Sequence, residues 1–176
     1  MIYIIFFVSC FIFLKFKFMD IKLRKIKKSD WPQMKKLLQE YSNYHKNIFK
    51  QIDPYFAIFE TGYQKKDFEK MLNKKRKMFL AACDGDKIIG FILAKIIEVK
   101  GDKTKFKQGF LSELFVTEKY RGKGVADLMW QEVLSWFKKE KVKFIQLSVL
   151  ANNEKTQQIY KKWGFKSLSL IMTKKL

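Results

Sequence analysis

Cysteine and histidine are scarce in this sequence. Its 176 residues include two cysteines, Cys10 and Cys83, and one histidine, His45. Two cysteines are too few for the disulfide framework of a small secreted domain, and no Cys/His spacing suits zinc. The composition therefore excludes a disulfide-stapled or zinc-bound scaffold, so we expect no resident metal and a reducing, cytoplasmic setting.

Acidic residues and arginine are scarce as well. The chain has 17 Asp and Glu against 37 Lys and Arg, a formal net charge of +20, and its only arginines are Arg24, Arg76 and Arg121. Such a balance is compatible with nucleic acid, a membrane surface or a phosphorylated cofactor as partner. The lysines are scattered rather than gathered on one element, which favours an A/T-rich codon bias over a nucleic-acid footprint as their cause.

The N-terminal apolar run is short for a membrane span. Residues 1–14 are apolar except for Ser9, and Lys15 and Lys17 then interrupt the run, whereas a spanning helix needs ~20 residues. A secretory signal would carry positive charge before the run and a small-residue cleavage site after it, and neither is present. Two interpretations of this hydrophobic extension, residues 1–18, stay open: a mis-assigned start codon upstream of Met19, or an N-terminal membrane anchor.

The rest of the chain, residues 19–176, has enough apolar sequence for one globular domain, since 48% of all residues are hydrophobic. Periodicity, turn signals and caps predict the order β-α-α-β-β-β-α-β-α-β. Helices are expected from Ser29 or Asp30 to before Asp53, and at 67–75, 124–141 and 154–163. Strands are expected at 21–26, 77–83, 87–99, 110–116, 144–150 and 166–173.

One junction carries a recognisable pattern. A buried strand ends at Val116, and the next helix opens on Arg121-Gly122-Lys123-Gly124-Val125-Ala126. A glycine-containing turn before a helix directs backbone N–H groups at one point, which favours a phosphate or pyrophosphate. The spacing matches neither a P-loop nor a dinucleotide-binding fingerprint. Taken alone, the turn is equally compatible with a purely structural role.

A second pattern lies near the C-terminus, where Asn153 is followed seven residues later by Tyr160 and then by Gly164-Phe165. Together with Arg121-x-x-Gly124-x-Ala126, it resembles the GNAT superfamily of acetyl-CoA-dependent N-acetyltransferases. The resemblance covers about residues 20–176. Three positions depart from the usual family pattern, namely Glu118, Thr156 and Asp127.

The resemblance implies an α+β fold of three layers: a mixed, mostly antiparallel sheet of six to seven strands with helices on both faces. Its central parallel strand pair would be splayed around acetyl-CoA, the co-substrate. Amides near Phe115 and Val116 would hold the pantetheine arm and polarise the thioester, and Asn153 would bind that arm or position the chain near it. The pyrophosphate would be bound by the amides of Arg121, Gly122, Lys123, Gly124, Val125 and Ala126.

The resemblance also implies two catalytic roles and no enzyme nucleophile, because the amine attacks the acetyl carbon directly. Tyr160 is the candidate general acid for the departing thiolate, and a packed tyrosine is the alternative. Glu113, a carboxylate within an apolar strand, is the candidate base, and pairing with a lysine is the alternative. Diamine acetyltransferases of the family often have acids at the positions of both Ser112 and Glu113, and this chain keeps only the second.

The leading hypothesis is therefore an N-acetyltransferase acting on a primary amine, carried by a small molecule or by a protein. The alternative is a non-catalytic acyl-CoA-binding or nucleic-acid-binding module on the same fold. Nucleic acid is not the expected partner, a membrane contact would involve only residues 1–18, and a homodimer is one alternative for the oligomeric state. The acceptor site is expected around His45 to Gln64, with Tyr44, Asp53, Tyr55, Phe56, Phe59 and Glu60.

Overall fold

The computed structural model describes residues 20–55, 62–72, 75–101 and 105–174. The N-terminal extension, residues 1–18, lies outside the described residues, as do Phe56, Phe59 and Glu60 of the expected acceptor segment. Within the described chain, no helix is long and apolar enough to cross a membrane.

A five-stranded sheet in the order β1-β2-β3-β4-β5 forms the centre of the described domain. Neighbouring strands are antiparallel except β4 and β5, which are parallel. The strands are β1 (Ile21–Lys25), β2 (Lys77–Asp84), β3 (Lys87–Lys100), β4 (Lys105–Val116) and β5 (Val142–Gln146). The expected mixed, mostly antiparallel sheet is confirmed.

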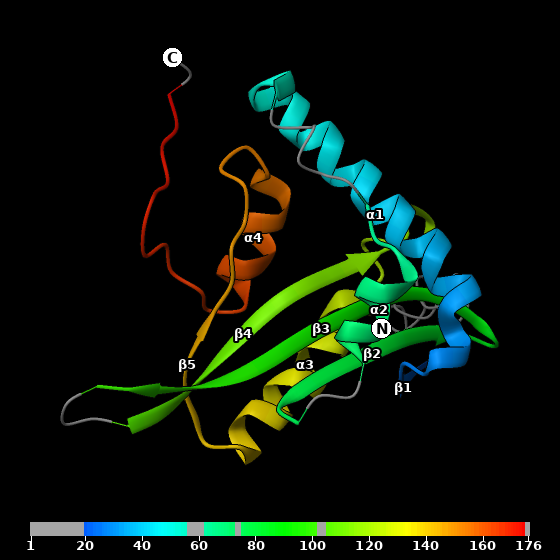
Figure 1. Cartoon of the computed structure of the whole chain (residues 1–176), viewed down its shortest axis with the longest axis horizontal. Coiled ribbons are helices and arrows are strands. Elements are labelled where there is room, and N and C mark those ends of the chain that lie inside the picture. The colour runs from blue at the N-terminus through cyan, green and yellow to red at the C-terminus, as the bar shows by residue number, and fades with distance from the viewer. Residues whose placement is uncertain (1–19, 56–61, 73–74, 102–104, 175–176) are drawn as a thin grey trace, which may run out of the picture.

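Helices cover both faces of this sheet, as expected (Figure 1). The helices are α1 (Trp31–Ile52), α2 (Lys65–Met71), α3 (Val125–Lys139) and α4 (Glu154–Lys162), with short 3-10 turns η1 (Lys28–Asp30) and η3 (Glu118–Tyr120). One core lies under α1 and α2 and includes Met34, Phe68 and Phe91, all fully buried. The other lies under α3, whose apolar stripe includes Met129 and Phe137.

The sequence patterns explain where the helices begin. Pro32 lies in the first turn of α1, where its missing N–H costs no hydrogen bond. Asp30 occupies the N-cap position, but its carboxylate accepts hydrogen bonds from Arg24 and the Lys27 amide instead of capping α1. The Arg24 guanidinium holds the pKa of Asp30 below its usual value. The position of Asn152 and Asn153 just before the helix predicts that one of them caps it, and Asn153 does so, since its Oδ1 accepts from the Thr156 amide.

A bulge and an early end of pairing open the sheet between β4 and β5. Leu93 of β3 pairs with Glu113 and Ala94 with Leu111, so Ser112 is an extra residue in β4. The parallel pairing of β4 with β5 ends at Phe110 and Gln146, although β4 continues to Val116. The central parallel pair is therefore splayed, as the resemblance implies.

The expected strand at 166–173 is wrong, and the sheet has five strands rather than six to seven. Alternating apolar residues favour a strand, but a strand also needs a hydrogen-bonded neighbour. In the described chain, no strand pairs with residues 166–174. For the same reason β5 ends at Gln146, four residues before the expected end at Leu150.

Candidate active site

The open edge of β4 presents backbone groups to the gap beside β5. The Thr117 amide donates to the Ile89 carbonyl of β3 at 2.9 Å. Backbone groups in an antiparallel ladder alternate in direction, so Phe115 also faces β3. Leu114 and Val116 then turn their amides and carbonyls toward the open edge. The resemblance singled out the amides near Phe115 and Val116. The register leaves Val116 at the open edge, turns the Phe115 amide toward β3, and adds Leu114 to the open edge.

The turn after β4 forms a cradle of backbone amides. Gly122 and Gly124 have φ angles of 70° and 77°, in the left-handed region that favours glycine. A Cβ on either glycine would meet nothing within 4 Å, so the surface above the turn is open. Among the described residues, no hydrogen bond of normal geometry takes up the amides of residues 122–126, whereas the Arg121 amide donates to Glu118. These residues therefore fit an anionic ligand at the N-terminus of α3.

Side chains around the cradle hold the turn in place. Tyr120 is buried and donates a hydrogen bond to Asp84 at 2.7 Å, which raises the pKa of Tyr120. The Lys123 ammonium lies 5.6 Å from the centre of the Tyr120 ring. Val125 is buried in the core and Ala126 is partly buried, so these two residues offer the ligand only their amides.

Arg121 connects β4 to α1. Its Nε donates to the Val116 carbonyl at 2.9 Å, and its guanidinium lies over the rings of Tyr44 and Phe115, at 4.9 and 5.3 Å. The side chain therefore lies at the open edge of β4, beside the amide cradle.

Glu113 and Tyr160 come together at the splayed edge. The hydroxyls of Tyr41 and Tyr63 both donate to the Glu113 carboxylate, the second at 3.3 Å. Burial, the negative charge of Glu113 and the neighbouring Tyr44 raise the pKa of Tyr160 to about 12. Tyr160 is thus held protonated close to a carboxylate, which suits a proton donor and a proton acceptor in one site.

Asn153 links the start of α4 to α1. Its Oδ1 accepts from the Thr156 amide and also from the Tyr44 hydroxyl, both at 3.4 Å. The neighbouring Asn152 donates to the Ile48 carbonyl near the end of α1 at 3.1 Å. The two asparagines therefore bridge the helices that flank the splayed strands.

Aromatic side chains line the α1 side of Glu113. The His45 ring packs at a tilt against that of Tyr41, with ring centres 4.3 Å apart, and is part of this cluster. The Tyr41 ring also contacts Phe91 and Phe115 edge-on. The spacing of Tyr41 from Met34 and Leu38 predicts a place on the buried face of α1. Nothing in the sequence indicates that its hydroxyl, or that of Tyr63, meets Glu113.

The unusual Asp127 is tied to α4. Its carboxylate accepts a hydrogen bond of 2.7 Å from the indole of Trp163. That indole stacks on Trp130 of α3, with centres 5.1 Å apart, and contacts the Tyr160 ring at 5.6 Å. Asp127 therefore joins the first turn of α3 to the helix that carries Tyr160.

We expect Asp127→Ala and Trp163→Phe to lower the free energy of unfolding by similar amounts, about 1 kcal/mol each, because each removes one partner of the same hydrogen bond. The double variant should cost little more than either single one. Asp127→Asn keeps an acceptor oxygen and serves as the matched control. Urea unfolding measures the four variants and the unchanged protein, and fully additive losses would show that the two side chains are not coupled.

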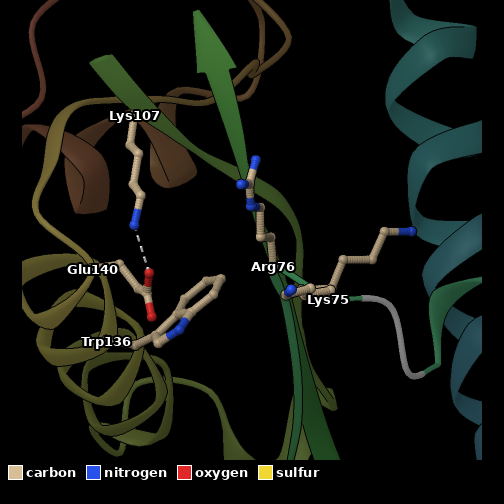
Figure 2. A pocket seen from close by; sticks show the side chains of 6 residues that line it. Lys75, Arg76, Lys107, Trp136 and Glu140 are labelled. Atoms are coloured by element: carbon tan, nitrogen blue, oxygen red, sulfur yellow. Dashed lines mark hydrogen bonds and ion pairs between the residues drawn. The ribbon is translucent and has the colours of Figure 1, made fainter. Parts of the chain in front are cut away.

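A separate basic pocket of about 300 Å³ lies at the other end of α3. Figure 2 shows Lys107 paired with Glu140 on one side and Arg76 and Lys75 on the other, with Trp136 between. Lys107 lies 2.8 Å from Glu140 and lowers the pKa of that carboxylate, while Arg76 pairs with Glu98 at 2.6 Å. Arg76 and Lys107 are thus already paired with acids, and the pocket lies at the C-terminal end of α3, away from the amide cradle at its N-terminus.

Comparison with known proteins agrees with this geometry. The family model "Acetyltransferase (GNAT) family" matches residues 31–165, and the chain belongs to that family. Comparison with curated protein sequences gave no match.

Solved structures share the fold at low identity. The tetramutant of the BH1408 protein from Bacillus halodurans is 21% identical with a TM-score of 0.76, over 88% of this chain and 99% of that one. Arabidopsis thaliana NAA60, in complex with a bisubstrate analogue, is 23% identical with a TM-score of 0.61, over 83% and 84%. An aminoglycoside acetyltransferase, meta-AAC0020, from an uncultured soil metagenomic sample, in complex with sisomicin, is 10% identical with a TM-score of 0.64, over 89% and 96%.

Proposed function

We propose that this chain is an N-acetyltransferase that transfers acetyl from acetyl-CoA to a primary amine, by direct attack in a ternary complex. The observation that carries the proposal is the open amide cradle of residues 122–126, placed beside the splayed edge of β4. Every helix leaves its first amides without an intrahelical acceptor, and here two left-handed glycines add the amides of the preceding turn to them. Their availability at a helix N-terminus supports a phosphate-containing ligand.

The residues of the cradle fit the diphosphate of coenzyme A, because Gly122 and Gly124 leave the amides accessible. The amides of Leu114 and Val116 are the donors available to the pantetheine arm and to the carbonyl of the thioester. Acetyl-CoA, when bound, supplies the activated acetyl group. Every other part of the proposed chemistry rests on side chains and amides of this chain.

Two side chains would move protons in this proposal. Tyr160, whose pKa is raised to about 12, stays protonated at neutral pH and would donate its proton to the departing thiolate. Glu113 would accept a proton from the attacking amine, directly or through water. Tyr41 and Tyr63 hold the carboxylate by hydrogen bonds and so fix its orientation.

Isothermal calorimetry with CoA, acetyl-CoA and duplex DNA tests the cofactor assignment. We expect CoA and acetyl-CoA to bind. Gly124→Val should weaken this binding, because a side chain at the left-handed position would strain and cover the cradle. Absence of CoA binding, together with DNA binding that falls steeply with salt, would instead support the non-catalytic module.

We propose that the acceptor is an amine carried by a small molecule or by a protein, and a screen of candidate amines identifies it. Thiol release from acetyl-CoA is followed with candidate amines. Because one similar structure is an aminoglycoside acetyltransferase in complex with sisomicin, sisomicin belongs in the screen beside polyamines, amino acids and peptides. The carboxylate of Glu113 among aromatic rings favours a cationic amine.

We expect Glu113→Gln to lower kcat by about 100-fold while leaving acetyl-CoA affinity unchanged, because the amide keeps the shape but does not accept a proton as readily. Ser112→Ala, at the exposed bulge residue next to it, is the matched control and should change kcat little. Steady-state kinetics with the acceptor from the screen measure both variants. If Glu113→Gln keeps more than about a third of kcat, the base assignment is wrong.

A further inference from the structure

The Arg121 side chain is not paired with an acid. The two other arginines of the chain each pair with a carboxylate, Arg24 with Asp30 at 2.7 Å and Arg76 with Glu98 at 2.6 Å. No ion pair of the described chain includes Arg121. A guanidinium is always charged and carries several N–H donors. Arg121 therefore has charge and donors left for a ligand.

The guanidinium of Arg121 is nevertheless held in one place. Its Nε donates to the Val116 carbonyl at 2.9 Å, and its Cζ lies 4.9 Å from the centre of the Tyr44 ring and 5.3 Å from that of Phe115. The terminal nitrogens, which form the fork that fits a carboxylate, have no hydrogen-bond partner among the described residues. A guanidinium oriented in advance, with its fork available, suits recognition of a carboxylate.

Arg121 and Glu113 belong to one aromatic cluster on the α1 side of the sheet. Glu113 and Phe115 are two residues apart in β4, so their side chains share a face. Tyr41 donates to Glu113, and its ring lies 5.7 Å from that of Phe115, which the Arg121 guanidinium also contacts. Figure 1 shows the C-terminal end of β4 beside α1. The site thus presents one carboxylate and one guanidinium to the same space under α1.

We propose that the acceptor is a small amine that also carries a carboxylate, such as a free amino acid, and that Arg121 binds this carboxylate. The inference rests on the proposed N-acetyltransferase function and names its substrate class. Glu113 takes a proton from the amine, whose nitrogen attacks the acetyl carbon. The C–N bond forms, the C–S bond of the thioester breaks, and the thiolate receives its proton from Tyr160. The carboxylate stays unchanged on Arg121.

The charge of the whole chain favours the same class of acceptor. Its net charge of +20 repels an amine with several ammonium groups, such as a polyamine. A carboxylate on the acceptor offsets the charge of its ammonium group and so removes that repulsion. An amino acid therefore meets a smaller electrostatic barrier than a polyamine of similar size.

The diphosphate of the cofactor is the competing anion, because the amide cradle begins at the next residue of the chain. The guanidinium, however, is anchored to the Val116 carbonyl of β4 and lies over Tyr44 of α1. Tyr44 borders the segment where the acceptor site is expected. This placement favours the carboxylate of an acceptor over the diphosphate, and the two roles predict different effects of replacing Arg121.

Matched acceptors test the assignment in the unchanged protein. Thiol release from acetyl-CoA is compared for each common L-amino acid against its amide, and for L-lysine against cadaverine, which lacks the carboxylate. We expect kcat/KM to be about 10- to 100-fold higher for the acid of the preferred pair, as for a charge-assisted, bidentate contact. The amine of an amino acid amide is the less basic one, so basicity alone would favour the amide. Equal values for acid and amide would overturn the proposal.

Arg121→Gln removes the charge but keeps a side-chain N–H for the Val116 carbonyl. It should lower kcat/KM for the acid by about 10- to 100-fold and change that for the amide little. Arg121→Lys keeps the charge without the fork and should retain part of the preference. Lys119→Gln removes a nearby exposed charge in η3 and is the matched control. If Arg121→Gln weakens CoA binding and lowers acid and amide alike, the guanidinium binds the cofactor and the proposal is wrong.

Calorimetry with the same amino acids, in the presence of CoA, separates this inference from the proposed function. Binding that is lost in Arg121→Gln, without thiol release from acetyl-CoA, would reject the transferase and keep the carboxylate site. Thiol release that does not distinguish acids from amides would keep the transferase and reject the carboxylate site. Absence of both binding and release would reject both.

Discussion

Replacing Tyr160 with phenylalanine is expected to lower kcat by about 100-fold, because the departing thiolate then receives no proton from the enzyme. The ring contacts with Trp163 and Phe165 remain in the variant, so the position of α4 should be kept. Calorimetry should give an unchanged affinity for CoA, which separates loss of chemistry from loss of binding. A decrease of less than about threefold at every pH would leave Tyr160 as a packing residue only.

The pH dependence of kcat in the unchanged protein is an independent check on Tyr160 as the general acid. Tyr160 must be protonated to act as an acid, and its pKa is raised to about 12, above the ordinary value for tyrosine. The acid form therefore persists through the whole range up to about pH 10, and loss of this proton should not reduce kcat there. A fall in kcat with a midpoint near pH 10 that disappears in Tyr160→Phe would contradict the raised pKa.

Phe91→Ala should produce the largest loss of stability among single changes in the core. The side chain is fully buried, and its ring lies 5.7 Å from that of Tyr41, 6.0 Å from Phe79 and 6.1 Å from Phe115. Truncation of a buried phenylalanine costs about 3–5 kcal/mol. That is a large part of the free energy of unfolding of a typical domain, which is about 5–15 kcal/mol.

Urea unfolding followed by circular dichroism measures the loss. Phe91→Leu, which keeps most of the volume, is the matched control and should cost less than about 1.5 kcal/mol. Because Phe91 supports both Tyr41 and Phe115, the alanine variant should also weaken the hold on Glu113. A loss below about 1 kcal/mol would show that the aromatic cluster closes the cavity by rearrangement.

Sequence patterns predicted those parts of the site that depend on residues close together in the chain. The glycine turn at residues 122–124 and the cap at Asn153 are set by backbone conformation and by bonds within a few residues, and both are found. The splayed strands followed from the family resemblance. The extra residue of the bulge, Ser112, is visible only once the register of β3 against β4 is known.

The rest of the site depends on contacts between distant segments. Tyr41 has the spacing of a core residue, and its bond to Glu113 arises because α1 packs over β4, 72 residues further along the chain. Asp30 has the position of a helix cap, but its carboxylate accepts two hydrogen bonds from the Arg24 guanidinium instead of capping the helix. The alternation at 166–173 is that of a strand, yet a pattern within one segment cannot specify the neighbour it pairs with.

The bridge from α1 to α4 has a consequence for the two substrates. Tyr44 borders the segment where the acceptor site is expected, and Asn153, which it contacts, is at the start of the helix that carries Tyr160. A shift of α1 on acceptor binding would alter this contact and with it the pantetheine side of the site. Thermodynamic linkage then requires that each substrate change the affinity of the other by the same factor.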